Sequence, residues 1–272
     1  MNWLGLEGKV AIVTGGAQGL GRTCCEGLAA VGVKIVVVDV NEDAGKKAVE
    51  QMKHTSGRDV MFVKADVTTR KSVDSVITHA LDKFGRVDVL VNNAGILIPR
   101  LLVDPAGKEE ITEDIVDRML AINVKGYFLC AQAAAREMIK SGKGGVIINM
   151  ASESGLEGSA GQSVYAATKS ANYSMTRSWA KELGKYNVRV VGIAPGILEA
   201  TALRSAEYER SLAYTRGITV DQLRDEYEKV SSPLGRVGKL NEVADLVCFL
   251  ASDRSAYVHG TTINISGGKS RG

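Results

Sequence analysis

The stretch VAIVTGGAQGLG, residues 10–21, is a run of branched apolar residues that ends directly in a glycine-rich turn. Its apolar part is typical of a buried strand, and helical periodicity follows from Arg22 to Val31. Such a turn lets the backbone approach a pyrophosphate, which the helix N-terminus favours electrostatically. Its spacing, Gly-x-x-x-Gly-x-Gly over Gly15, Gly19 and Gly21, is not the commoner Gly-x-Gly-x-x-Gly. The stretch predicts a dinucleotide-binding turn, with a tight connection of no further role as the alternative.

The same alternation of strand and helix runs along the chain. Near-continuous apolar strands separated by helices imply a parallel sheet covered on both faces. We therefore expect an α/β fold: one domain, 1–272, with a doubly wound, Rossmann-type parallel sheet of about seven strands and helices on both faces. The expected strands are 10–14, 34–39, 60–63, 87–91, 146–150, 188–193 and 261–265, and the expected helices include 22–31, 41–53, 71–84, 113–140 and 241–252.

Two segments depart from a simple alternation. The long helix 113–140 changes character around Asn123 and Gly126, where we expect a break. The segment from about 198 to 232 is rich in charge and tyrosine, and Thr219 with Gln222 has the spacing of a capping box. We expect two helices there, inserted outside the sheet as a small substrate lid.

The composition excludes several classes of protein. The 272 residues are 45% hydrophobic and 24% charged, which is ordinary for a globular chain, and the net charge of +3 is too small and dispersed to favour nucleic acid or membrane partners. No signal-like leader or membrane-length apolar run is present. The four cysteines and three histidines lack metal-type spacing, so we expect reduced thiols, no metal and a cytoplasmic location.

The stretch VIINMASESGLEGSAGQSVYAATK, residues 146–169, contains the candidate reaction centre. Tyr165 and Lys169 are four apart on an expected helix and so share one face. An ammonium near a phenol favours the phenolate and lowers the pKa of the phenol toward working pH. Ser152, at the end of the preceding strand, adds a second hydrogen-bonding group. Tyr165 is thus a candidate proton donor and acceptor; a surface Tyr and Lys at this spacing is the alternative.

Asp39 indicates which dinucleotide is bound. It ends the second expected strand about 20 residues after the glycine-rich turn, where a carboxylate can bond the adenosine ribose hydroxyls. Its charge would repel the extra phosphate of NADP, and Gln18 and Asn41 supply no positive charge to bind it. NAD is the expected cofactor.

Together these motifs resemble the short-chain dehydrogenase/reductase family over essentially the whole chain. The residues that carry the resemblance are Thr14–Gly21, Asp66, Asn92-Asn93-Ala94-Gly95, Asn123, Ser152, Tyr165, Lys169 and Pro195-Gly196. The resemblance implies a symmetric homo-oligomer, a tetramer or dimer. It also implies a cofactor site made of Gly15, Gln18, Gly19, Leu20, Gly21, Asp39, Asp66, Val67, Asn93, Ala94, Gly95, Tyr165, Lys169, Pro195, Gly196 and Ile197.

The resemblance also implies four catalytic roles. Tyr165 would be the general acid/base, while Lys169 would lower its pKa and bond the nicotinamide ribose. Ser152 would polarise the substrate oxygen, and Asn123 would help to hold a water for proton relay. Asp66 would contact adenine and Asn93 would lie near the adenosine ribose. This full set argues against a non-catalytic NAD-binding sensor.

Within the family, several variable stretches resemble the sorbitol-6-phosphate 2-dehydrogenases. They include PRLLVD at 99–104, the sequence around Tyr165, YTRGITVDQLR in the lid and the ending TTINISGGKSRG. The resemblance implies NAD-dependent interconversion of sorbitol 6-phosphate and fructose 6-phosphate, with a small phosphorylated polyol as partner. A short-chain dehydrogenase acting on an unphosphorylated polyol or a 3-oxoacyl group is the alternative.

A phosphorylated polyol needs cations for its phosphate and polar groups for its hydroxyls. Arg100 is the best-placed cation, because loops at the carboxyl ends of strands form the binding crevice. Glu153, Glu157 and Gln162 could bond the hydroxyls, with Glu157 and Gln162 as the candidates, and either glutamate could instead cap a loop or lie at an interface. The other candidate cations are Arg204, Arg210, Arg216, Lys269 and Arg271.

Overall fold

Parallel strands form one seven-stranded sheet in the computed structural model, which describes residues 3–56, 59–201, 203–228 and 232–270. The strand order is β3-β2-β1-β4-β5-β6-β7, and every neighbouring pair runs parallel. The strands are β1 (Val10–Thr14), β2 (Lys34–Asp39), β3 (Val60–Lys64), β4 (Val89–Asn92), β5 (Gly145–Met150), β6 (Val188–Pro195) and β7 (Thr262–Ile265). The predicted doubly wound parallel sheet is confirmed.

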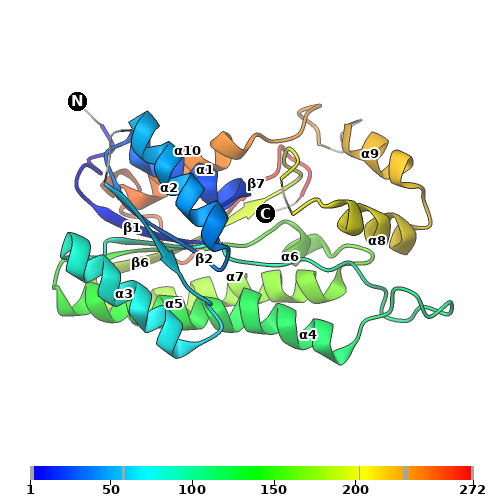
Figure 1. The fold of residues 1–272 in the computed structure, drawn as a ribbon, viewed down its shortest axis with the longest axis horizontal. Coiled ribbons are helices and arrows are strands. Elements are labelled where there is room, and N and C mark those ends of the chain that lie inside the picture. The colour runs from blue at the N-terminus through cyan, green and yellow to red at the C-terminus, as the bar shows by residue number, and fades with distance from the viewer. Residues whose placement is uncertain (1–2, 57–58, 202, 229–231, 271–272) are drawn as a thin grey trace.

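Helices cover both faces of this sheet (Figure 1). One face carries α1 (Gly19–Ala30), α2 (Glu42–Ser56) and α10 (Leu240–Ala251), and the other carries α3 (Arg70–Phe84), α5 (Gly126–Lys140) and α7 (Ser163–Leu183). Because side chains alternate along a strand, each strand supplies both layers. Ala11 and Val13 of β1 enter the core under α1, while Val10 and Ile12 enter the core under α5. Burial on both sides explains why the strands read as unbroken apolar runs.

The expected helix 113–140 is interrupted where the sequence predicts a break. Helix α4 (Glu113–Leu120) passes into a π-helical turn, η1 (Ala121–Lys125), before α5 begins at Gly126. A Cβ at Gly126 would lie 2.8 Å from Val67 Cγ2. Only glycine therefore allows the start of α5 to pack this closely against the loop that follows β3. The wider turn directs Asn123 fully into the interior.

The expected lid consists of α8 (Ala206–Arg216) and α9 (Val220–Glu228), which lie outside the sheet beyond its carboxyl edge (Figure 1). The predicted capping box is present: Gln222 Oε1 accepts from the Thr219 amide at 2.9 Å, and Thr219 Oγ1 accepts from the Gln222 amide at 3.1 Å. A small apolar cluster that contains Leu212 and Leu223 joins the two helices. Residues 202 and 229–231 of the expected lid lie outside the described residues.

No helix in the described part of the chain is long and apolar enough to span a membrane. The four cysteines are buried free thiols.

Candidate active site

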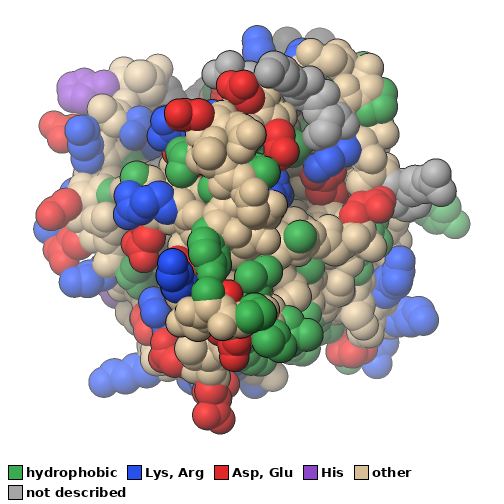
Figure 2. All heavy atoms as spheres, turned by 90° about the vertical axis from the view of Figure 1, so that its right-hand side faces the viewer, with side chains coloured by type: hydrophobic (Ala, Val, Ile, Leu, Met, Phe, Trp, Pro, Cys, Tyr) green, Lys and Arg blue, Asp and Glu red, His purple; other side chains and the backbone are tan. Residues whose placement is uncertain are grey.

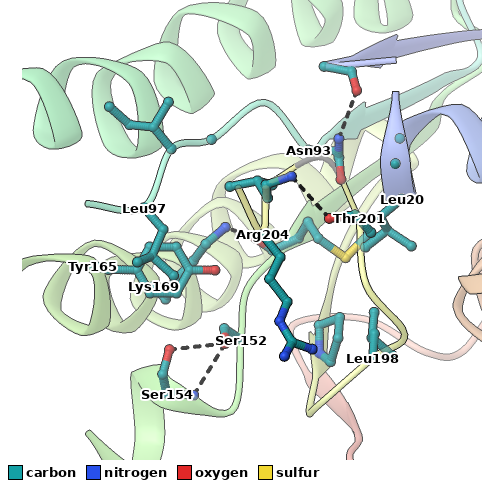
Figure 3. Close-up of a pocket in the computed structure, with 18 of the residues that line it drawn as sticks. Leu20, Asn93, Leu97, Ser152, Ser154, Tyr165, Lys169, Leu198, Thr201 and Arg204 are labelled. Carbon is teal, nitrogen blue, oxygen red and sulfur yellow. Dashed lines mark hydrogen bonds between the residues drawn. The ribbon is translucent and has the colours of Figure 1, made fainter. Parts of the chain in front are cut away.

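A cavity of about 1050 Å³ lies at the carboxyl edge of the sheet, where the strand order reverses between β1 and β4. We call its two parts the cofactor end, formed by the loops after β1 to β4, and the substrate end, formed by residues 153–162, the lid and Lys269. Tyr165, Lys169 and Ser152 lie between them (Figure 3). The predicted catalytic, cofactor and substrate residues line this cavity except Asn123 and Arg100, and of the other described candidate cations only Arg210 does not line it.

The glycine-rich turn forms a cradle that side chains would fill. A Cβ at Gly21 would lie 2.1 Å from the Gly15 carbonyl oxygen, and Gly15 and Gly19 have left-handed φ angles of +64° and +52°. Gln18, the N-cap of α1, makes no side-chain cap, and the first turn holds no acidic residue. The first amides of α1 are therefore available to an anion, and the turn fits the pyrophosphate of a dinucleotide.

The loop after β4 is tied to this turn by side chains. The side-chain amide nitrogen of Asn93, Nδ2, donates to the carbonyls of Thr14 (3.0 Å) and Gly15 (3.3 Å). The Thr14 hydroxyl accepts from the backbone amides of Asn93 and Ala94 at 3.0 and 3.1 Å. Asn93 thus holds the two loops of the cofactor end together, in addition to lining the cavity.

Asp39 lies at the end of β2, and its carboxylate faces the cofactor end. Within the described residues its hydrogen-bond donors are two backbone amides, of Ala17 at 3.2 Å and of Asn41 at 3.0 Å. The first contact joins Asp39 to the glycine-rich turn. The carboxylate has acceptor capacity left for ribose hydroxyls.

Ser152 follows β5, and Tyr165 lies in the first turns of α7. The Ser152 hydroxyl lies near the Tyr165 phenol and acts to lower its pKa, and it accepts from the amide and the hydroxyl of Ser154 at 3.3 and 3.0 Å. Tyr173, two turns further along α7, donates its hydroxyl to the Ser152 carbonyl at 3.1 Å. Both the backbone and the side chain of Ser152 are therefore fixed facing Tyr165.

The prediction that Lys169 lowers the pKa of Tyr165 is wrong for this structure. Desolvation raises the pKa of Tyr165 to about 12, opposed only by the nearby Ser152 hydroxyl. Lys169 Nζ donates to the Met150 carbonyl at 2.6 Å and to the Tyr127 hydroxyl at 3.4 Å, and lies 5.6 Å from the centre of the Tyr165 ring. Burial also lowers the pKa of Lys169 to about 7, which weakens the charge available to stabilise a phenolate.

Asn123 is fully buried and acts through its neighbours. Its Oδ1 accepts from the Ile96 amide at 2.9 Å, and its Nδ2 donates to the Ile96 carbonyl at 2.9 Å and to Thr168 Oγ1 at 3.1 Å. Asn123 therefore joins the β4 loop to the helix that carries Tyr165. Its expected role in holding a water stays a prediction.

The structure does not bring Arg100 into the cavity. Its guanidinium forms an ion pair with Glu109 at 2.5 Å and contacts the Pro99 carbonyl at 2.7 Å. Arg100 Nη1 also donates to Ser211 Oγ of α8 at 3.5 Å, and Arg100 does not line the cavity, so the structure does not place it as the best-placed substrate cation. Gln162 and Glu157 do line the cavity, and Gln162 Nε2 donates to the Tyr208 hydroxyl at 3.1 Å.

Two tyrosines of the substrate end were not singled out from the sequence. Tyr208 and Tyr227 line the cavity with their hydroxyls 3.4 Å apart, and the tyrosine-rich lid was the only signal for them. Lys269 donates to Glu153 Oε1 at 2.6 Å, while Glu153 Oε2 is buried without a hydrogen-bond partner in the described structure. Arg271 lies outside the described residues.

The charges around the lid end of the molecule do not form a field of one sign. Figure 2 views this end and shows acidic and basic side chains interspersed across it. The described residues contain no group of three or more His, Cys, Asp or Glu that could hold a metal ion. Recognition of a charged ligand must therefore come from individual residues within the cavity.

Three features are those of a dehydrogenase: the glycine cradle, the Asp39 carboxylate at the cofactor end, and the group of Ser152, Tyr165 and Lys169. The chain belongs to the short chain dehydrogenase family, whose profile matches residues 9–211. Sorbitol-6-phosphate 2-dehydrogenase of Klebsiella pneumoniae is 50% identical to it over 273 residues, covering 99% of each chain. The chain is thus an oxidoreductase of this family.

Two solved structures show the same architecture. Levodione reductase superposes with a TM-score of 0.86 at 32% identity, covering 97% of this chain and 98% of its own. The 3-ketoacyl-(acyl-carrier-protein) reductase of Brucella melitensis, complexed with NADH, superposes with a TM-score of 0.81 at 29% identity, covering 98% of this chain and 100% of its own. The family relationship therefore extends over the whole fold.

Proposed function

We propose that this chain interconverts sorbitol 6-phosphate and fructose 6-phosphate with NAD as cofactor. The observation that supports this substrate is the 50% identity, over nearly the full length, to an enzyme named for it. The span of this match includes the lid and the tail, which contribute to the substrate end of the cavity.

NAD rather than NADP is supported by Asp39. Its carboxylate faces the cofactor end and has acceptor capacity for the two ribose hydroxyls. A phosphate on that ribose would meet a like charge at close range, with no described lysine or arginine paired to Asp39 to neutralise it. The same position would therefore discriminate against NADP.

The chemistry follows from the arrangement of three side chains. A bound nicotinamide supplies the hydride acceptor. Tyr165 removes the proton from the C2 hydroxyl of the polyol, while the Ser152 hydroxyl bonds the same oxygen and fixes its direction. In the reverse direction Tyr165 returns this proton to the carbonyl oxygen of the ketose. Lys169, which the Met150 carbonyl holds beside the phenol ring, is the residue that would bond the nicotinamide ribose.

The test is formation of NADH from NAD with sorbitol 6-phosphate, compared with sorbitol, mannitol 1-phosphate and galactitol. We expect kcat/KM for sorbitol 6-phosphate to exceed that for sorbitol and for galactitol by at least about tenfold, the value of one lost charged contact. Good turnover of a free polyol with none of the phosphorylated one would contradict the proposal. It would support the alternative of an unphosphorylated polyol.

The homo-oligomer and the cytoplasmic location stay predictions. Leu120 and Phe128, on α4 and α5, are large apolar side chains that are 42% and 47% exposed in the single chain, and a subunit contact would cover them. Sedimentation of the purified protein measures the oligomeric state.

A further inference from the structure

The lid contains a cluster of two guanidinium groups around one carboxylate. Arg204 Nε lies 2.9 Å from Glu209 Oε1, and Arg224 donates to Glu209 Oε2 from Nε at 3.0 Å and Nη2 at 2.7 Å. Glu209 is 7% exposed, and these two arginines lower its pKa, so it carries its negative charge. Arg224 is also paired with the exposed Asp221, at 3.7 Å, so Glu209 is shared between the two arginines while Arg224 has a second acidic partner.

Of the two arginines, Arg204 is the one that lines the cavity. Figure 3 shows its side chain extending from the segment of Thr201 into the space between Leu198 and Ser152. Its Nε approaches Glu209 closely, but no acceptor in the described structure has hydrogen-bond geometry to it. Its two terminal nitrogens likewise have no hydrogen-bond partner among the described residues. The charge of Arg204 is therefore only partly used by the protein.

The position of this guanidinium is fixed before any ligand arrives. Its carbon lies 3.9 Å from the centre of the Tyr227 ring, so the two groups stack. The Tyr227 hydroxyl is 3.4 Å from that of Tyr208, which accepts from Gln162. The Arg204 amide donates to the Thr201 carbonyl at 2.9 Å. A preorganised group loses less conformational entropy when it binds a ligand.

The other candidate cations among the described residues are paired one to one or lie outside the cavity. A cation matched to a single carboxylate must give up that partner, or share it, to bind a second anion. The pairs are Arg100 with Glu109 at 2.5 Å, Arg216 with Glu226 at 3.5 Å and Lys269 with Glu153 at 2.6 Å, while Arg210 is exposed outside the cavity.

We infer that Arg204 binds the phosphate group of the substrate and selects phosphorylated polyols over free ones, with Tyr227 and Glu209 as its positioning residues. The inference rests on the proposed function. A guanidinium presents parallel N–H groups that match two oxygens of a phosphate, and its charge favours a dianion. A free polyol offers neither charge nor this geometry at the same place.

The first experiment compares Arg204→Gln with the unchanged enzyme on sorbitol 6-phosphate and on sorbitol. We expect the KM for sorbitol 6-phosphate to rise about 10- to 100-fold, the loss typical of a hydrogen-bonded charge. We expect kcat to change less than about threefold, and activity on sorbitol to stay the same, because the reacting atoms are not touched. Arg210→Gln, an exposed neighbour on α8, is the matched control and should leave both substrates unaffected.

The second experiment tests the stacked ring. Tyr227→Leu removes it and should raise the KM for sorbitol 6-phosphate several-fold, whereas Tyr227→Phe keeps the ring and should preserve the KM. A role that depends on the hydroxyl would instead rank Phe as harmful as Leu, because both variants lack it. That ranking would overturn the positioning role of the Tyr227 ring.

Failure of this inference is distinguishable from failure of the proposed function. If the unchanged enzyme turns over sorbitol 6-phosphate and Arg204→Gln leaves its KM unchanged, Arg204 does not bind the phosphate. If the unchanged enzyme does not turn it over, the proposed substrate is wrong, and inorganic phosphate still tests the site. Phosphate should raise the unfolding temperature of the unchanged enzyme more than that of Arg204→Gln. Equal shifts in the two proteins would overturn the assignment.

Discussion

The two ends of the cavity are built by different means. The cofactor end consists mainly of backbone: a Cβ on Gly21 would lie 2.1 Å from the Gly15 carbonyl oxygen, and Asp39 and Asn93 bond main-chain groups of the glycine-rich turn. The substrate end consists of side chains that meet across long sequence distances, as in the contact of Lys269 with Glu153, 116 residues apart. A backbone site tolerates few changes but serves any member of the family. A side-chain site can be altered one residue at a time, which allows one fold to serve many substrates.

Tyr165 lies between the two ends, and its removal should have the largest effect. In Tyr165→Phe no group can take the hydroxyl proton, so we expect kcat to fall about 10³-fold, within the 10²- to 10⁴-fold range of general acid–base catalysis. Cofactor affinity, measured by the fluorescence of bound NADH, should change less than about threefold. Tyr257→Phe, at a fully exposed tyrosine, is the matched control. Turnover retained in Tyr165→Phe would refute its assigned role.

The next largest effect tests the backbone nature of the cofactor end. Gly21→Ala places a methyl group against the Gly15 carbonyl and Asn93 Nδ2, so the turn must move. Overpacking of this kind costs about 1–3 kcal/mol, and we expect cofactor affinity to fall about 10- to 100-fold. The control is Gly85→Ala at the end of α3, where φ is +74° and nothing lies within 4 Å of the added Cβ. That change should lower stability by about 1–2 kcal/mol through backbone strain and leave cofactor affinity intact. Equal loss of affinity in both variants would contradict the cradle.

Removal of the Asp39 charge tests the side chain to which we assign the preference of the cofactor end for NAD over NADP. Asp39→Asn keeps an oxygen that can accept from the Ala17 amide but removes the charge. We expect the ratio of kcat/KM with NAD to that with NADP to fall about 10- to 100-fold, since hydrogen bonds to a charged acceptor are lost and repulsion of the phosphate is relieved. Glu42→Gln, at a partly exposed carboxylate at the start of α2, is the control for net charge. An unchanged ratio of kcat/KM with NAD to that with NADP would contradict the assignment of NAD selectivity to Asp39.

The contrast between the two ends also explains what the sequence can predict. The sheet, the π-helical break near Asn123 and the cofactor residues follow from local patterns, because each depends on neighbours in the chain or on backbone geometry. Arg100 was misplaced because the sequence does not reveal that Glu109, a loop away, neutralises it. The pKa of Tyr165 was misjudged because helical spacing gives the position of Lys169 but not the direction of its ammonium, which bonds Met150.

The raised pKa of Tyr165 makes the reaction depend on pH. Oxidation of the polyol needs the phenolate, and with a pKa of about 12 the phenolate fraction rises about tenfold per pH unit throughout the lower range. We expect kcat/KM for oxidation to increase steadily from about pH 7 to pH 10, the range accessible to measurement. Reduction of the ketose needs the neutral phenol, so its kcat/KM should stay flat over the same range. A flat profile for oxidation would mean that another group takes the proton.

The smallest effect concerns a single pair at the substrate end. Lys269→Met removes the ammonium 2.6 Å from Glu153 Oε1 and leaves a mostly buried carboxylate whose other oxygen already lacks a partner in the described structure. The Lys269 side chain is 32% exposed, so solvent screens the pair and its value is at most about 1 kcal/mol. We expect the KM for sorbitol 6-phosphate to rise about two- to fivefold, with cofactor affinity unchanged. Lys185→Met, at an exposed lysine remote from the cavity, is the control. A loss of cofactor affinity in Lys269→Met would show that the tail contributes to the cofactor end as well as to the substrate end. The division of the cavity into a backbone end and a side-chain end would then be wrong at Lys269.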